Sequence, residues 1–151
     1  MEIERKFLIK NIPGTLEKYE HHIIEQGYLC TDPVVRVRKS DDSYYMTYKG
    51  KGLLAREEYN LPLNKEAYEH LVSKADGNII RKTRYLIPLE NTELTVELDV
   101  FDAPFAPLIM AEVEFSSLEQ ADAFTPPDWF AEEVTNDRKY HNSNMSKMKL
   151  Q

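Results

Sequence analysis

The chain has 151 residues and a formal net charge of −7, with 42% hydrophobic and 30% charged residues. This length and apolar content predict a single domain, residues 1–151, with a real hydrophobic core, and they exclude wholesale disorder. The acidic balance argues against a nucleic-acid partner, because nucleic-acid surfaces carry a basic excess. The single cysteine, Cys30, excludes an internal disulfide and a cysteine-based metal cluster.

Other features bear on location and assembly. The first residues lack a basic segment followed by an apolar run, and no stretch approaches ~20 consecutive apolar residues. We therefore expect no signal peptide, no membrane partner and a cytoplasmic location, which a lone cysteine also fits. A homodimer is expected from base rates alone.

Alternating apolar and charged residues predict a chain made mostly of β-strands. The expected strands are residues 1–9, 22–30, 34–39, 44–49, 54–61, 79–87, 94–101 and 108–115, the fifth ending at Pro62. Short helices are expected at 15–19 with Thr15 as its cap, at 64–75 with Asn64 as its cap, from Ser116 or Ser117 through Phe124, and near 145–149. The residues from Ala131 onward are polar. The pattern is typical of an antiparallel meander that closes on itself, with short helices.

The charged positions on these strands are sorted by sign. Acidic residues recur at alternate positions as Glu2/Glu4, Glu97/Asp99 and Glu112/Glu114, and basic residues recur as Arg36/Arg38 and Lys82/Arg84. Residues two apart on a strand share a face, so like charges lie side by side and repel. An ordinary solvent-facing sheet is the alternative for any single strand. Taken together, the sorted signs favour a binding site in which ligands neutralise both sets.

The residue types indicate the ligands. Carboxylates without histidine or cysteine suit hard cations such as Mg²⁺ or Mn²⁺. Arginine forks suit phosphate oxygens, and one phosphate does not require seven bases, so a chain of phosphates is expected. No phosphate-binding G-x-x-x-x-G-K-[ST] loop is present. The seven bases are Lys6, Arg36, Arg38, Lys49, Arg56, Lys82 and Arg84.

Read in order, these motifs resemble the CYTH superfamily of triphosphate tunnel metalloenzymes. Its E-x-E-x-K signature is matched by Glu2-Ile3-Glu4-Arg5-Lys6, and the other motifs follow in the family's order over nearly the whole chain. These are Glu25–Leu29, Arg36-x-Arg38, Lys49, Arg56-x-Glu58, Lys82-x-Arg84-Tyr85, Glu97-x-Asp99, Glu112-x-Glu114-Phe115 and the tail Val134–Asn142. Asn60 departs from the pattern, because relatives often place a further inward acid there.

The resemblance implies an eight-stranded antiparallel β-barrel, a tunnel with charged residues inside and apolar residues outside under short helices. It also implies the roles of the residues. Glu2, Glu4 and Glu114 are expected to bind a first divalent metal, and Glu58, Glu97, Asp99 and Glu112 to bind a second or to orient water. The seven bases are expected to bind phosphates. Lys82 would polarise the attacked phosphate or assist the leaving group, with Glu58 and Glu112 as further catalytic residues.

Several activities occur in this superfamily. Metal-dependent removal of the terminal phosphate from inorganic triphosphate is expected first, because small bacterial members that begin at this motif often act in this way. A class IV adenylyl cyclase and a thiamine triphosphatase are the alternative enzymes. A polyphosphate- or nucleotide-binding module without catalysis is the alternative of another class. The two acidic sets favour an enzyme, since anion binding alone has little use for so many carboxylates.

Overall fold

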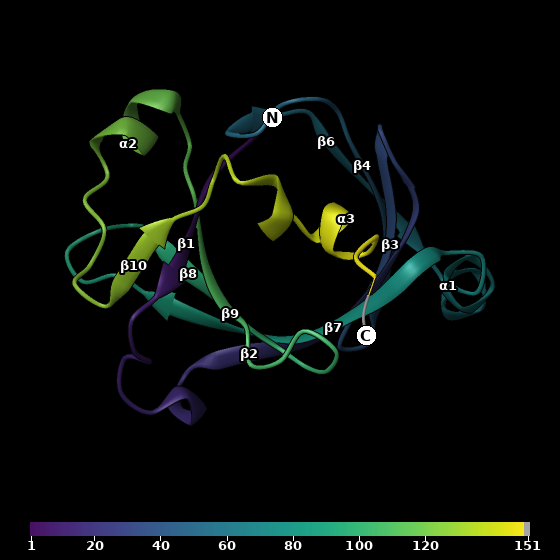
Figure 1. The fold of residues 1–151 in the computed structure, drawn as a ribbon, viewed down its shortest axis with the longest axis horizontal. Coiled ribbons are helices and arrows are strands. Elements are labelled where there is room, and N and C mark those ends of the chain that lie inside the picture. Colours follow the sequence, from purple (N-terminus) through teal and green to yellow (C-terminus); the bar gives the residue numbers. More distant parts are fainter. Residues whose placement is uncertain (150–151) are drawn as a thin grey trace.

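A curled antiparallel β-sheet dominates the computed structural model, which describes residues 1–149 (Figure 1). The strands are β1 Glu2–Ile9, β2 Glu20–Thr31, β3 Val34–Ser40, β4 Ser43–Lys49, β5 Ala55–Arg56, β6 Glu58–Leu63, β7 Asp76–Pro88, β8 Thr95–Phe101, β9 Ile109–Glu114 and β10 Phe130–Glu133. The helices are η1 Leu16–Lys18, α1 Lys65–Val72, α2 Leu118–Ala123, η2 Arg138–Tyr140 and α3 Asn142–Met145. Among these described residues, no helix is long and apolar enough to cross a membrane.

The strand order explains the ring seen in Figure 1. The order is β10-β1-β9-β8-β7-β2-β3-β4-β6, and β5 pairs with β1 through Glu2 opposite Arg56 and Ile3 opposite Ala55. Only Glu57 separates β5 from β6, so the two act as one interrupted strand that brings the sheet back to β1. The ring therefore has eight strand positions, and β10 lies outside it beside β1. The predicted eight-stranded antiparallel barrel is confirmed, with α1 and α2 outside it, but α3 lies inside the ring, where no helix was expected.

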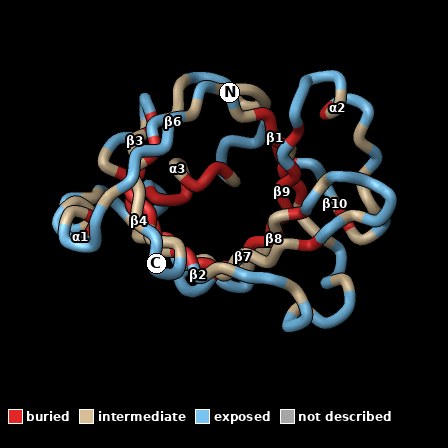
Figure 2. Tube along the Cα trace, turned by 180° about the vertical axis from the view of Figure 1, so that it is seen from behind, coloured by how far each residue is buried: buried red, intermediate tan, exposed pale blue. Residues whose placement is uncertain are grey.

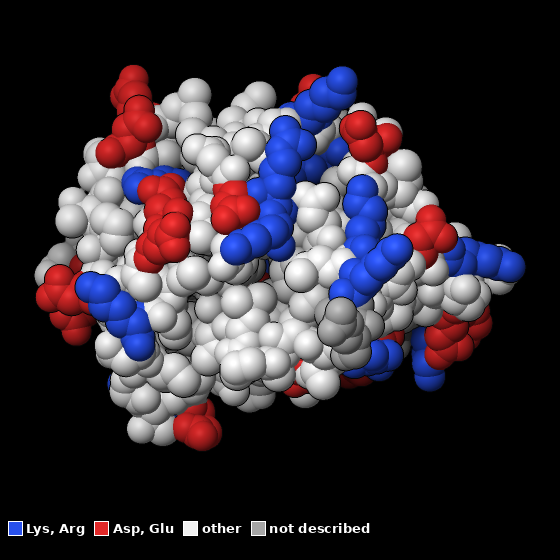
Figure 3. Space-filling model, in the orientation of Figure 1, with Lys and Arg blue, Asp and Glu red and all other residues white. Residues whose placement is uncertain are grey.

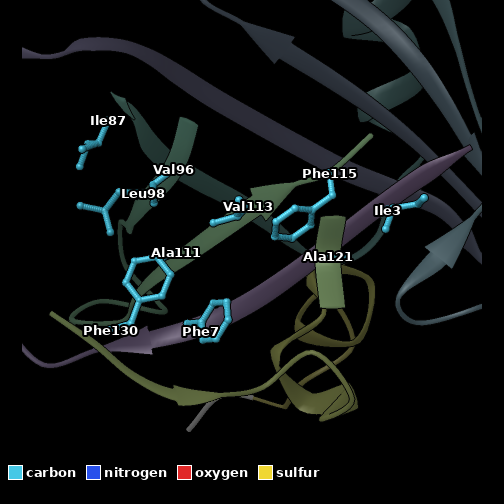
Figure 4. Packing of buried hydrophobic residues seen from close by; sticks show 10 residues of the cluster. All are labelled: Ile3, Phe7, Ile87, Val96, Leu98, Ala111, Val113, Phe115, Ala121 and Phe130. Atoms are coloured by element: carbon cyan, nitrogen blue, oxygen red, sulfur yellow. The ribbon is translucent and has the colours of Figure 1, made fainter. Parts of the chain in front are cut away.

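The larger of the two apolar core clusters lies on the outside of this ring, and the smaller one, with Tyr28 and Met145, lies on its inner side. Ile3 and Phe7 of β1, Leu98 of β8 and Val113 of β9 are buried in one cluster that α2 and Phe130 of β10 cover (Figure 4). Each of these residues alternates with a charged residue that points to the other face of its strand. The fold thus buries its apolar side outward, under the helices, and turns its charged side inward.

The predicted helix caps are partly confirmed. The side chain of Asn64 accepts a hydrogen bond from the backbone of Ala67 at the start of α1, and Ser117 does the same for Gln120 at the start of α2. The expected cap at Thr15 is wrong, because η1 is a single 3₁₀ turn and Thr15 makes no side-chain cap bond.

Two predicted boundaries are also wrong. The strand expected at 54–61 is interrupted at Glu57 and continues through Pro62 to Leu63. Proline is tolerated there because β6 ends the sheet path, so its missing N–H removes no bond on the unpaired edge. The polar tail contains a strand, β10, that its composition did not predict, and α3 begins at Asn142, ahead of the expected 145–149.

Candidate functional site

A cavity of about 240 Å³ occupies the interior of the ring. Every candidate site residue except Asp99 lines this central cavity, and together these residues come from eight different strands. They are Glu2, Glu4, Lys6, Arg36, Arg38, Lys49, Arg56, Glu58, Lys82, Arg84, Glu97, Glu112 and Glu114. The alternative of a solvent-facing sheet therefore fails, because side chains such as Lys82 and Glu112 are only 1% and 5% exposed.

Three carboxylates converge on one side of the cavity. Glu4, Glu97 and Glu112, from the neighbouring strands β1, β8 and β9, each place an oxygen atom within 4.8 Å of the others. Burial, together with Glu112, raises the pKa of Glu97, although Arg84 opposes this effect. A set of oxygen ligands that repel one another at this spacing fits a hard divalent cation.

This trio differs from the first metal set that the sequence suggested. Glu2 is the first residue of β1, and Lys49 Nζ donates to both of its oxygens at 3.0 Å. Burial raises the pKa of Glu2 to about 8, with further contributions from Glu4 and from a hydrogen bond to Glu58. The pKa of Glu58 moves the other way, to about 2, because the hydrogen bond to Glu2 and the charge of Lys49 outweigh the effect of burial. Glu114 is exposed, and burial and Glu4 raise its pKa.

Asp99 lies behind the cavity wall and joins two bases. It is fully buried, and its two carboxylate oxygens lie 2.7 Å from Lys82 Nζ and 2.7 Å from Arg84 Nε. Arg84 also donates to Glu97 at 2.9 Å. Both Asp99 oxygens thus contact cations, an arrangement that positions the side chains of Lys82 and Arg84. Asp99 itself does not line the cavity.

Lys82 has an unusual electrostatic environment. Burial lowers its pKa to about 7, and the cations Arg84 and Arg38 add to this effect while Asp99 and Glu112 oppose it. Its amine also donates to the side-chain oxygen of Asn142 at 2.9 Å. A lysine in this environment exchanges a proton near neutral pH, which is the behaviour expected of a general acid or base.

The opposite wall carries arginines without acidic partners. Arg36 and Arg38 of β3 are 6% and 8% exposed, and their hydrogen bonds go to the neutral groups of Thr47, Gln26 and Tyr45. Among the described residues, neither these two nor Arg56 forms a salt bridge, and the Nε atoms of Arg36 and Arg56 are buried without a partner. Unpaired buried cations are costly, so this wall is complementary to an anion.

Sequence reasoning did not predict seven residues that line or adjoin the cavity, among them Tyr28, Val34 and Tyr45. His141, Asn142 and Ser143 line the cavity because the C-terminal segment, residues 138–147, lies inside the ring (Figure 1). Gln26 of β2, fully buried, bridges Asn142 and Arg38. Gln26 and Asn142 both fall within motifs that follow the CYTH order, which was the available signal. Asn60 is bound to Thr47 and Glu58 and supplies no further acid.

The fold and the lining residues can now be compared with known proteins. A family model described as the CYTH domain matches residues 1–149. The chain belongs to the CYTH family. This confirms the resemblance seen in the motifs, from Glu2–Lys6 to the tail.

Within this family, the chain is similar to curated inorganic triphosphatases. It is 43% identical over 145 residues to one from Nitrosomonas europaea, covering 93% of both chains. It is 35% identical over 151 residues to one from Acetivibrio thermocellus, covering 97% of this chain and 93% of the other. A solved structure of an inorganic triphosphatase matches with a TM-score of 0.74 and 37% identity, over 99% of this chain and 96% of that one.

Proposed function

We propose that this CYTH protein hydrolyses the terminal phosphate of inorganic triphosphate with the help of a divalent metal ion. The observation that supports this most is the pairing, across one buried cavity, of arginines without acidic partners and a trio of converging carboxylates. The similar proteins of known activity are inorganic triphosphatases. A polyanion accompanied by a cation complements both walls, and neither ligand alone does so.

The bases of the cavity would hold the phosphate chain. Within residues 1–149, Arg36, Arg38 and Arg56 have no acidic partner, and they offer planar donor groups to phosphate oxygens. Lys6, Lys49 and Arg84 are already bound to carboxylates and would be shared between these and the substrate. Each charge-assisted hydrogen bond to phosphate contributes roughly 1.5–3 kcal/mol.

The donor chemistry fits Mg²⁺ or Mn²⁺ at Glu4, Glu97 and Glu112. Glu2 lies two residues from Glu4 on β1, and Glu114 lies two residues from Glu112 on β9. Both, together with Glu58, would supply further oxygen ligands, directly or through water. When bound, such an ion neutralises charge on the phosphate oxygens and aligns the chain for attack. Asp99 does not line the cavity, so we expect it to position Lys82 and Arg84 and not to bind the ion.

Lys82 is the residue best suited to move the proton. With a pKa of about 7, its amine is partly neutral and can accept a proton from the attacking water. The water oxygen bonds to the terminal phosphorus, and the bond from that phosphorus to the bridging oxygen breaks. Pyrophosphate and orthophosphate result, and the water's proton goes to Lys82. The remaining catalysis is alignment and charge neutralisation by the cavity walls.

The lining of the cavity favours a small inorganic substrate. Among the described residues that line it, only Val34 is aliphatic, and only Tyr28, Tyr45 and His141 carry aromatic rings. Adenine or thiamine would need an apolar shelf for stacking, and this lining offers little.

Phosphate release tests the proposal. The purified protein is incubated with triphosphate, ATP or thiamine triphosphate, each with Mg²⁺, Mn²⁺ or a chelator. We expect orthophosphate from triphosphate in the presence of either metal, and little from the other two compounds. Cyclic AMP from ATP would indicate a cyclase, and preferred turnover of thiamine triphosphate the other enzyme. Tight binding of triphosphate without turnover would indicate a binding module.

A further inference from the structure

The C-terminal segment is built into the ring. Figures 1 and 2 show α3 inside it, and the buried residues of this segment appear red in Figure 2. Met145 is 1% exposed and packs in a core cluster with Tyr28 and Ile80. At the start of β7, Asn78 donates through its backbone to the carbonyl of Ser146 at 2.6 Å and through its side chain to that of Met145 at 3.2 Å. The segment is therefore a fixed wall of the central cavity. In Figure 3, drawn in the orientation of Figure 1, Lys and Arg side chains lie on the surface near this segment.

One amide of this wall reaches the proposed reaction centre. The Oδ1 atom of Asn142 accepts hydrogen bonds from Lys82 Nζ at 2.9 Å and from Gln26 Nε2 at 3.0 Å. Gln26 Oε1 in turn accepts from Arg38 Nε at 2.7 Å. All four side chains are at least nine-tenths buried.

The donors fix the orientation of both amides. Turning Asn142 over would place its NH₂ group against two donors, Lys82 and Gln26, and turning Gln26 over would place its NH₂ group against Arg38. Only one arrangement satisfies every group. Asn142 is thereby linked directly to Lys82 of β7 and, through Gln26 of β2, to Arg38 of β3.

The same contacts direct the amine of Lys82. Asp99 at 2.7 Å and Asn142 at 2.9 Å take two of its tetrahedral positions. The third position is left for the cavity, which Lys82 lines. Asn142 supplies a neutral acceptor here. The charged groups around Lys82 are Asp99 of β8, Glu112 of β9, Arg84 of β7 and Arg38 of β3, so a second carboxylate in direct contact would change its charge balance.

We propose that Asn142 is a positioning residue. It directs the Lys82 amine toward the reacting phosphate and, through Gln26, fixes the position of the Arg38 guanidinium relative to that amine. This inference rests on the proposed role of Lys82 in triphosphate hydrolysis. The C-terminal segment is then a part of the active centre, contributed by the last turn of the described chain. Asn142 itself acts through Lys82 and Arg38.

Two substitutions separate positioning from simple folding. Asn142→Ala removes the acceptor, and Asn142→Asp keeps an oxygen at the same place but adds a negative charge. Asn136→Ala and Asn136→Asp are matched controls, because Asn136 is exposed in the same tail and does not line the central cavity. Thermal unfolding followed by circular dichroism identifies any variant that fails to fold. Asn142→Asp retains the acceptor and is the variant expected to keep the segment in place.

Kinetics give the first readout. With triphosphate and Mg²⁺, Asn142→Ala is expected to lower kcat roughly tenfold to a hundredfold with a smaller change in KM, because the amine loses its direction and not its charge. Asn142→Asp is expected to move the rise of kcat/KM to a pH higher by about one unit or more, as a carboxylate in contact with an amine does. The Asn136 variants should match the wild type.

A second readout does not depend on activity. In protein with ¹⁵N-labelled lysine, the Nζ resonance of Lys82, identified by its loss in Lys82→Arg, is titrated with pH. Asn142→Asp should raise its midpoint, and Asn136→Asp should not. If Asn142→Asp leaves both this midpoint and the pH profile at their wild-type values, the proposal is wrong. If the wild type does not hydrolyse triphosphate but the Nζ midpoint shifts as expected, the proposed function fails while the contact is upheld.

Discussion

Neutralising Asp99 distinguishes a positioning role from a metal-binding role. Asp99 is fully buried and holds Lys82 at 2.7 Å and Arg84 at 2.7 Å. In Asp99→Asn, the buried cations Lys82 and Arg84 lose the negative charge that both contact. Removing one partner of a buried ion pair costs roughly 3–5 kcal/mol. Lys82 can shed its proton and Arg84 keeps its bond to Glu97, so we expect about 3 kcal/mol, near the low end of that range.

Urea unfolding and thermal melting measure this loss. For a domain of this size, about 3 kcal/mol lowers Tm by roughly 6–12 °C. Asp42→Asn is the control, an exposed position in the turn after β3 where the same substitution should change stability by less than about 0.5 kcal/mol. Mn²⁺ affinity, measured by calorimetry, should change little in Asp99→Asn. Wild-type stability together with lost Mn²⁺ binding would refute the positioning role and support the metal role that the sequence suggested.

Three other residues give further predictions. Lys82→Ala should lower turnover of triphosphate by roughly two orders of magnitude or more, whereas an unchanged rate would remove Lys82 from the site. Because a proton acceptor works in its neutral form, kcat/KM of the wild type should rise with pH through about 7, and a profile that falls there would assign Lys82 a role as a charged donor instead. Glu4→Gln should abolish metal-stimulated turnover and weaken Mn²⁺ binding while the melting curve shows a folded protein; full activity would exclude Glu4 as a ligand. Gly77→Ala should destabilise the protein by roughly 1–3 kcal/mol in urea unfolding, since Gly77 has a φ of +71° and an added Cβ would lie 2.0 Å from the carbonyl oxygen of Ser146. Gly50→Ala is the control, because a Cβ there would lie 3.7 Å from its nearest atom. Equal losses of unfolding free energy in the two variants would contradict the close packing of Gly77 against the C-terminal segment.

The barrel and the inward charges could be predicted because a strand has a strict period of two. On β1, Glu4 and Lys6 alternate with Ile3 and Phe7, and the charged set must share one face whatever the neighbours are. Knowing which face turned inward required the family resemblance, because charged residues usually face water. The structure confirms the inverted arrangement, with the core cluster of Figure 4 outside the ring.

The finer assignment within the cavity depends on strand register, which the sequence pattern does not contain. Glu97 of β8 lies opposite Glu112 of β9. On the other side of β9, Lys6 of β1 lies opposite Glu112, which brings Glu4, two residues before Lys6, close to the same place. The three acids that meet therefore come from three strands. Sequence spacing grouped Glu2 with Glu4 because they are two residues apart on one strand. The roles predicted for these residues remain predictions until a metal or substrate is seen.

The C-terminal segment could not be predicted because it has no periodic pattern. Its residues are mostly polar, and its helix α3 is only four residues long. Its place in the ring is set by tertiary contacts that involve distant residues, such as Asn78 with Ser146 and Gln26 with Asn142. Such contacts override local propensity, which is weak in short elements.

The most direct test of the central claim is a crystal structure of the protein soaked with Mn²⁺ and a triphosphate analogue whose bridging oxygens are replaced by imido groups. Anomalous scattering locates the manganese. We predict a peak bound by Glu4, Glu97 and Glu112, with phosphates lying against Arg36 and Arg38 inside the ring. Manganese or the analogue bound only on the outer surface, with the central cavity filled by water alone, would contradict the account.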